Sequence, residues 1–177
     1  MPDLGFKLMT LFFRIIDCFY SDENIIDKFG IKPGNTVIDY GCGPGRYIKK
    51  VSEVVGSTGK VYAVDIHEIA MQYVKRKIKK FKLDNVSPVL AKGYSCNIEN
   101  GEADLIFALD MFHMIKDPTF FLEELNRIIK KDGVLIIEDG HQARKKSKKK
   151  IIDSQVWQVI EETKRYLKCK TLKKNIK

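Results

Sequence analysis

The sequence predicts an α/β domain built on a doubly wound, mainly parallel β-sheet. Five short apolar segments, rich in Val, Ile and Leu, are typical of strands that are buried on both faces. These predicted strands are residues 36–40, 61–65, 86–90, 104–109 and 134–138. Between them, apolar residues recur at helical spacing over residues 45–55, 67–82 and 118–130. Because strands alternate with helices, we expect parallel strands with helices on both faces of the sheet.

The chain has 177 residues, the size of a single domain, and its pattern divides it into three parts. Residues 1–33 are expected to form a helical lid, because apolar residues recur at helical spacing from Leu4 to Phe19. Residues 34–140 contain the alternating strands and helices and form the expected ligand-binding core.

The third part, residues 141–177, carries the excess positive charge of the chain. It holds 13 Lys or Arg residues against 3 acidic ones, in a chain of formal net charge +9. We expect one helix here, beginning near Asp153 and burying Trp157, and one short strand at residues 167–172. The sequence leaves open whether this edge of the sheet is complete, and it leaves the oligomeric state unknown; an incomplete edge would favour pairing with another chain.

A run of basic residues lies at the start of this third part, from Arg144 to Lys150. Clustered lysines attract polyanions such as RNA. The run contains no aromatic residues on which bases could stack. We therefore interpret it as a solvated, mobile linker and do not favour a nucleic-acid contact through residues 144–150.

The cysteines and the apolar N-terminal stretch indicate the compartment. Four cysteines are widely separated and form no Cys-x-x-Cys pair, and the three histidines are scattered along the chain. This pattern predicts free thiols in a reducing cytoplasm and no metal site. The apolar stretch at residues 8–13 is too short to span a membrane. We expect a cytoplasmic protein without a membrane span.

Three alternating glycines, Gly41, Gly43 and Gly45, follow the first predicted strand, and Asp65 ends the second. Ligands of doubly wound sheets bind beyond the carboxyl ends of the strands, where glycines let backbone N–H groups approach them. A carboxylate at the next strand end can accept hydrogen bonds from both hydroxyls of a ribose. A nicotinamide dinucleotide site would need a glycine where this chain has Arg46, so the pattern counts against a dinucleotide.

Four stretches of the chain resemble the motifs of the class I S-adenosylmethionine-dependent methyltransferases. Val37–Gly45 is similar to the first motif of that family, and Val61–Ile66 is similar to the second. Glu102–Pro118 and Leu125–Leu135 are similar to the fourth-strand region of its small-molecule branch, which is related to the quinone-biosynthesis C-methyltransferases. The likeness covers residues 22–140 in the family's order and implies a Rossmann-like methyltransferase fold.

The resemblance implies S-adenosylmethionine as the cofactor and a role for each matching position. Asp39 and the loop Gly41–Gly45 would border its methionine part. Asp65 would hold the ribose, and Ile66 would pack beside the adenine. The implied cofactor-binding residues are Asp39, Tyr40, Gly41, Gly43, Gly45, Asp65, Ile66, Gly93, Tyr94 and Leu109.

The chain departs from the family after the third predicted strand. The family usually has an acidic residue there, followed by a small one, and this chain has Lys92 and Gly93. A lysine cannot accept a hydrogen bond from the adenine amino group, whereas the Gly93 N–H group can donate to a ring nitrogen. Adenine recognition is then expected from Tyr94, Ser95 or a backbone carbonyl.

The candidate catalytic residues follow the fourth and fifth predicted strands. Transfer of a methyl group from a sulfonium is an in-line displacement, for which alignment of the reacting atoms is the main requirement. A general base is needed only where the acceptor must lose a proton. Asp110, His113 and His141 fall on the ligand side of the sheet and are the candidates for that base.

The acceptor is expected to be a small molecule, because the loop Leu109–Phe112 lacks the Asn-Pro-Pro-Tyr pattern of enzymes that methylate exocyclic base amines. An RNA or protein methyltransferase with the basic segment as a docking arm is one alternative. A non-catalytic module that binds S-adenosylmethionine or S-adenosylhomocysteine is another. A nicotinamide-dependent oxidoreductase is the least favoured hypothesis.

Overall fold

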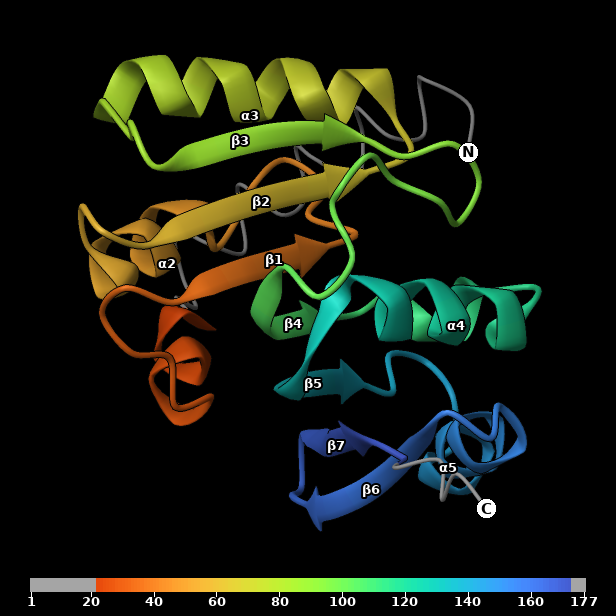
Figure 1. The fold of residues 1–177 in the computed structure, drawn as a ribbon. Helices are drawn as coiled ribbons and strands as arrows, with labels where there is room; N and C mark the ends of the chain where they lie inside the picture. Colours follow the sequence, from red (N-terminus) through yellow and green to blue (C-terminus); the bar gives the residue numbers. More distant parts are fainter. Residues whose placement is uncertain (1–21, 173–177) are drawn as a thin grey trace.

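A computed structural model describes residues 22–172, whereas the predicted lid helix over residues 4–19 lies outside the described residues. The described chain forms a seven-stranded sheet in the order β3-β2-β1-β4-β5-β7-β6 (Figure 1). Its strands are β1 (Thr36–Tyr40), β2 (Lys60–Asp65), β3 (Val86–Leu90), β4 (Ala103–Ala108), β5 (Ile129–Glu138), β6 (Trp157–Glu162) and β7 (Tyr166–Thr171). The five strands predicted from the apolar segments are therefore all present.

Strands β1 to β5 run parallel, and β7 and β6 complete the sheet in the antiparallel sense. The central strand β1 pairs with β2 on one side and with β4 on the other. Asp39 lies opposite Ala63 and Phe107 in these two pairings. The chain order reverses between β1 and β4, and this is the point at which ligands bind in doubly wound sheets.

Helices cover both faces of the sheet, as predicted. One core packs under the 3₁₀-helix η1 (Asp22–Lys28), α2 (Ile48–Val55) and α3 (Glu68–Phe81). The other core packs under α4 (Pro118–Ile128) and α5 (Arg144–Asp153). A short 3₁₀-helix, η2 (Phe112–Met114), follows β4. None of the helices within residues 22–172 is long and apolar enough to span a lipid bilayer.

Local sequence signals explain where several of these helices begin and end. Asp117 caps α4, accepting a hydrogen bond from the Phe120 N–H group, and Pro118 occupies the first helical position. Helix α3 ends at Lys82, which adopts a left-handed conformation and donates from its backbone N–H to the Ile78 carbonyl. Helix α4 leads directly into β5. Because β5 pairs with β4 in the parallel sense, the loops that follow these two strands lie side by side.

The C-terminal part differs from the prediction. The predicted helix beginning near Asp153 is wrong, because residues 157–162 form strand β6 and the helix lies earlier, at α5. The number of strands at this edge, which the sequence left open, is two, since β7 pairs with β5 and β6 pairs with β7. Trp157 is buried as predicted, but it packs from a strand, and its indole N–H group donates to the Leu122 carbonyl at 2.8 Å.

The basic run is a helix, so its interpretation as a mobile linker is wrong. It forms most of α5, and Ser147 and Ile151 of that helix are buried. Several of its cations have acidic partners within the domain, in the pairs Arg144 with Asp139, Lys148 with Glu162 and Lys149 with Asp153. These pairings use charge that a free docking arm would present to a polyanion.

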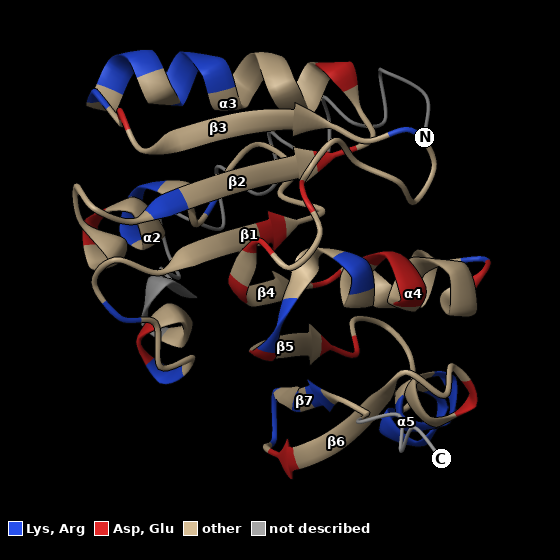
Figure 2. Ribbon diagram, in the orientation of Figure 1, with Lys and Arg blue, Asp and Glu red and all other residues tan. Residues whose placement is uncertain are grey.

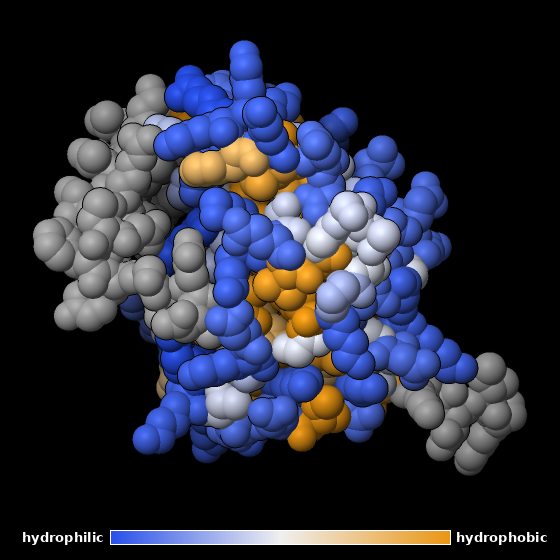
Figure 3. All heavy atoms as spheres, turned by 90° about the vertical axis from the view of Figure 1, so that its left-hand side faces the viewer, coloured by the Kyte–Doolittle hydropathy of each residue, from blue (hydrophilic) through white to orange (hydrophobic). Residues whose placement is uncertain are grey.

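Charge is distributed unevenly over the fold. Figure 2 shows acidic residues at the carboxyl ends of β1 and β2, while Lys and Arg gather along α3 and α5. The opposite side, at the amino ends of the parallel strands, is mostly hydrophilic, with apolar side chains in separate spots (Figure 3). Acidic residues therefore gather at the carboxyl ends of the central strands, which is the edge of the sheet where a ligand is expected to bind.

The packing of Trp157 gives the first prediction. Trp157→Phe removes the indole N–H donor and part of the buried ring, so we expect the free energy of unfolding to fall by about 1–3 kcal/mol. Ile160→Thr is the matched control, because Ile160 lies on the same strand and is 48% exposed. Chemical denaturation should show a change within about 0.5 kcal/mol for the control. Equal losses in both variants would contradict the described packing.

Candidate active site

The glycine loop after β1 is held against the end of β2 by backbone hydrogen bonds. The N–H group of Gly41 donates to the Val64 carbonyl at 2.8 Å. The N–H group of Gly43 donates to Oδ2 of Asp65, also at 2.8 Å. Gly43 has φ of +51°, a conformation that side chains with a Cβ adopt at a cost. The loop and the acid predicted from the sequence are thus joined in one structure.

The three glycines of the loop serve different purposes. A Cβ on Gly41 would lie 2.9 Å from Cγ of Met111, and a Cβ on Gly45 would lie 2.9 Å from Cδ1 of Ile48. These two glycines let neighbouring elements pack closely. Among residues 22–172, a Cβ on Gly43 would meet nothing within 4 Å. The backbone of Gly43 therefore borders open space into which a ligand can fit.

The loops after β2 and β3 supply the features expected for a nucleoside. Both carboxylate oxygens of Asp65 accept backbone hydrogen bonds, Oδ2 from Gly43 and Oδ1 from His67 at 2.9 Å, so its orientation is fixed. Ile66 follows at once and is 57% exposed, which leaves an apolar surface for a flat ring. Gly93 has φ of +63° and open space beside it. The roles that the resemblance implies for these positions stay predictions.

Lys92 lies in the tight turn that presents Gly93. The backbone N–H group of Lys92 donates to the Ser95 carbonyl at 2.9 Å, and Lys92 is exposed. Its side chain can therefore leave the adenine position free, and the accessible Gly93 N–H group remains a donor for a ring nitrogen.

The side chains of Tyr40 and Leu109 are buried, and Tyr94 is half-buried. The Tyr40 hydroxyl donates to the Tyr94 carbonyl at 2.6 Å, and its ring packs edge-on against Phe121. The Tyr94 hydroxyl accepts from the Asp117 N–H group at 3.0 Å. Leu109 is 9% exposed and belongs to the core. The two tyrosines thus anchor the loop after β3 to the start of α4.

Asp39 is a buried carboxyl group at the centre of the site. It is 3% exposed, and its Oδ2 atom is buried without a hydrogen-bond partner among the described residues. Burial raises the pKa of the Asp39 carboxyl well above its usual range, the Asp65 carboxylate raises it further, and the Lys77 ammonium lowers it. A cationic ligand beside Asp39 would offset this cost.

Asp110, His113 and His141 come together after β4 and β5. The Oδ1 atom of Asp110 lies 3.8 Å from Nε2 of His141, and the two imidazole rings meet edge-to-face with 5.0 Å between centroids. Burial lowers the pKa of His113, the charges of His141 and Lys150 act in the same direction, and the Asp110 carboxylate opposes them. The three catalytic candidates, of which His141 is distant in sequence from the other two, therefore share one site.

One contact joins this cluster to the glycine loop, and one hydrogen bond joins it to the end of β5. Met111, the neighbour of Asp110, packs its side chain on Gly41. Glu138, at the end of β5, accepts a hydrogen bond from the Asp110 N–H group at 3.2 Å, and Asp110 itself has φ of +51°. The positions of Met111 and Glu138 in the site were not predicted from the sequence, because they depend on which loops lie side by side.

Lys77 of α3 is a further residue missed from the sequence. Its ammonium group donates to the Gly45 carbonyl at 2.7 Å, at the end of the glycine loop. The signal available was weak: Lys77 follows Val74 by three positions and so shares the helix face that packs on Gly45.

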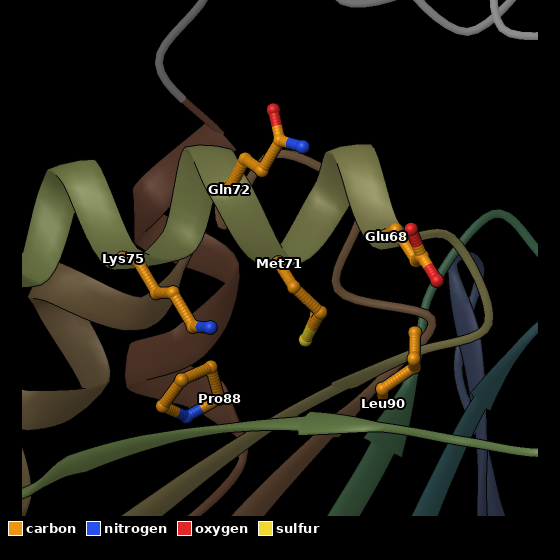
Figure 4. A pocket seen from close by; sticks show the side chains of 6 residues that line it. All are labelled: Glu68, Met71, Gln72, Lys75, Pro88 and Leu90. Carbon is orange, nitrogen blue, oxygen red and sulfur yellow. The ribbon is translucent and has the colours of Figure 1, made fainter.

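A separate groove of about 300 Å³ lies between α3 and β3. Figure 4 shows Met71 and Lys75 of α3 facing Pro88 and Leu90 across it. It contains neither the glycine loop nor the three catalytic candidates, so we assign it no role in the site.

Fold and site together define an α/β domain that binds a nucleoside-type cofactor at the carboxyl ends of its central strands. Residues 31–175 match a family model described as a methyltransferase domain, and the chain belongs to this family. A solved S-adenosylmethionine-dependent methyltransferase from Aquifex aeolicus is 30% identical, with a TM-score of 0.70 over 84% of this chain and 87% of that one.

Curated relatives are also methyltransferases. The demethylmenaquinone methyltransferase of Staphylococcus saprophyticus is 27% identical over 120 residues, which are 68% of this chain and 51% of that protein. A ubiquinone/menaquinone biosynthesis C-methyltransferase of Shewanella sp. is 26% identical over 139 residues, 78% of this chain and 55% of that protein. The chain thus spans about half the length of these relatives.

The family's cofactor, S-adenosylmethionine, fits the residues present. Its sulfonium and amino groups are cations, which suit the buried, unpartnered oxygen of Asp39. Its nucleoside suits Asp65, exposed Ile66 and the open backbone of Gly93. Gly43 leaves the space between these two ends free.

We expect Asp39→Asn to raise the stability of the protein and to weaken its binding of the cofactor. Because the pKa of Asp39 is raised in the folded state, the stability it contributes is present below its unfolded pKa of about 3.9 and is lost as pH rises through the folded pKa. At pH 8 we expect the variant to melt at a higher temperature than the parent, with the difference shrinking as pH falls.

The same variant should bind S-adenosylmethionine about tenfold or more weakly, because a charge-assisted interaction contributes about 1.5–3 kcal/mol. Thermal melting and calorimetry measure the two effects. Asp132→Asn, at an exposed position of β5, is the control and should change neither. A variant that melts lower at every pH and binds normally would contradict this electrostatic account.

Proposed function

We propose that this protein transfers the methyl group of S-adenosylmethionine to a small-molecule acceptor. The observation that carries the proposal is the junction at the centre of the sheet, where Met111 packs on Gly41. That contact sets the loop of Asp110 and His113 against the glycine loop, so an acceptor beside the cluster would lie next to the methyl donor.

Each part of the site has a distinct task in this proposal. S-adenosylmethionine supplies a methyl group bound to a positively charged sulfur. Asp65 and Gly93 hold the nucleoside, and Asp39 balances the positive charge of the methionine end. Alignment of donor and acceptor at about 3–3.5 Å then supplies most of the rate enhancement.

Asp110, His113 and His141 remain the candidates for contact with the acceptor. Burial lowers the pKa of His113, which favours the neutral imidazole and leaves a nitrogen able to accept a proton. His141 is 83% exposed and Asp110 is 44% exposed, so both can meet a bound molecule. An acceptor whose nucleophile carries a proton is the class that suits this cluster.

A small acceptor is favoured over RNA or protein by the state of the basic segment. Arg144, Lys148 and Lys149 pair with acidic residues of the domain. The curated relatives named above act in quinone biosynthesis by their names, which supports an aromatic or quinol-type acceptor.

We further propose the cytoplasm as the compartment. Cys42, Cys96 and Cys169 are free thiols, and all three are buried. Burial raises the pKa of the Cys96 and Cys169 thiols to about 12, which keeps them protonated and unreactive. Thiols of this kind suit a reducing environment.

Gly43→Ala tests the cofactor site against a matched control. Both Gly43 and Gly30 have positive φ and open space where a Cβ would lie, so alanine costs each about 1–2 kcal/mol of stability. Only at Gly43 would the methyl group occupy ligand space. By calorimetry we expect Gly43→Ala to weaken S-adenosylhomocysteine binding about tenfold or more, and Gly30→Ala to leave it unchanged.

The outcomes separate the functional hypotheses. Absence of heat with either S-adenosylmethionine or S-adenosylhomocysteine for the parent protein would refute the proposal. Binding without methyl transfer to any of a panel of phenols and quinols would favour the non-catalytic module. Retention on an RNA column that high salt abolishes, with methylation of that RNA, would favour the docking-arm alternative.

A further inference from the structure

Asp110, His113 and His141 have the composition of a transition-metal site. Each offers one ligand atom, and these three atoms lie within 4.8 Å of one another. Two imidazoles and one carboxylate form a set that first-row divalent ions such as Zn²⁺, Co²⁺ and Fe²⁺ bind, leaving positions open for further ligands. The prediction of no metal site rested on the separation of the histidines in the sequence. The fold brings His113 and His141 together in space.

The surroundings of His113 show that its ring is placed by packing. A Cβ on Gly140 would overlap the His113 ring at Nδ1, so only glycine admits the imidazole here. That Nδ1 atom is buried and has no hydrogen-bond partner among the described residues, although the residue as a whole is half-buried. A buried ring nitrogen that makes no hydrogen bond costs stability. The fold therefore holds this ring beside Asp110 and His141 at some expense.

We propose that Asp110, His113 and His141 bind one divalent transition-metal ion at the carboxyl ends of β4 and β5. Ligand atoms bound tetrahedrally at about 2.1 Å from an ion lie about 3.4 Å apart, so no separation within the cluster has to close by more than about 1.4 Å. His141 is 83% exposed and can rotate to shorten its distances to the other two ligands. Asp110 and His113 already lie on one short loop around η2.

The nearby charges act in both directions on an ion. Glu138 brings a second carboxylate, which accepts the Asp110 N–H hydrogen bond and fixes the direction of that loop. Lys150 opposes a cation, but its ammonium group is engaged with the Phe112 carbonyl at 3.1 Å and with the Phe112 ring face. Arg165 also opposes a cation, since its guanidinium lies 3.7 Å from the Glu138 carboxylate. The site thus sets one ligand carboxylate and one supporting carboxylate against the restrained Lys150 ammonium and the Arg165 guanidinium paired with Glu138.

The ion would hold the acceptor next to the methyl donor, and this role rests on the proposed function. An ion in an open site lowers the pKa of a bound hydroxyl. A phenol or enol bound through its oxygen would lose its proton to solvent. Its electron pair would form the new bond to the methyl carbon as the methyl–sulfur bond breaks, with that bond's electrons remaining on sulfur.

Titration of metal-free, untagged protein with Co²⁺ tests the ion site without reference to activity. We expect one Co²⁺ per chain, with visible absorption typical of nitrogen and oxygen ligands and no thiolate charge-transfer band. Zn²⁺ should displace the Co²⁺, and excess Mg²⁺ should not, because imidazole ligands disfavour Mg²⁺. Asp110→Asn and His141→Ala should each weaken binding about tenfold or more.

His67→Ala is the matched control, since His67 is the remaining histidine of the chain and lies outside the cluster. It should bind Co²⁺ like the parent. His141→Ala alters an exposed side chain, so melting temperature should show that it folds. Absence of Co²⁺ binding, or equal binding in all variants, would overturn the proposal.

The two proposals fail separately. Protein that binds S-adenosylhomocysteine but no Co²⁺ refutes the metal site and leaves the proposed function in place. Protein that binds Co²⁺ through Asp110 and His141 but gives no heat with S-adenosylhomocysteine refutes the proposed function and leaves the metal site.

Discussion

The hydrogen bond between the Gly43 N–H group and the Asp65 carboxylate joins the loop after β1 to the end of β2, with 2.8 Å between the two atoms. It fixes the loop whose other glycines pack on Met111 and Ile48, and so it positions both the open space at Gly43 and the loop after β4. The same carboxylate accepts the His67 N–H group at the start of α3. A nucleoside would therefore meet an acid that is already oriented, which reduces the entropy lost on binding.

Two buried carboxylates at the centre of the sheet cost stability and create the binding site. Asp39 and Asp65 are 3% and 8% exposed, and repulsion between them adds to the effect of burial on the pKa of Asp39. The Lys77 ammonium compensates part of this charge while it holds the Gly45 carbonyl. In the proposed function, a cationic cofactor would supply the remaining compensation. The site is thus more complementary to the bound state than to the empty one, a common source of lowered stability at functional sites.

The sequence predicted the parallel part of the fold because its signals are local. Buried strands alternate with helices, and the Asp117-Pro118 cap marks the start of α4. The prediction of a helix in the C-terminal part was wrong because the spacing of Trp157, Val159 and Ile160 suits either a helix or a strand. Pairing with β7 decides between the two. Asp110, His113 and His141 were each predicted to face the ligand. Their proximity depends on pairing of β4 with β5 and on space at Gly140, neither of which a single sequence records.

The central claim is that the glycine loop, Asp65 and Gly93 together bind the adenosyl cofactor. Backbone amide NMR of the protein, titrated with S-adenosylhomocysteine and separately with NAD⁺, tests it most directly. The amide signals of Gly43 and His67, which both donate to Asp65, and of Gly93 should shift with S-adenosylhomocysteine and not with NAD⁺. Unchanged signals at these three positions under saturating S-adenosylhomocysteine, or equal shifts with NAD⁺, would contradict the account.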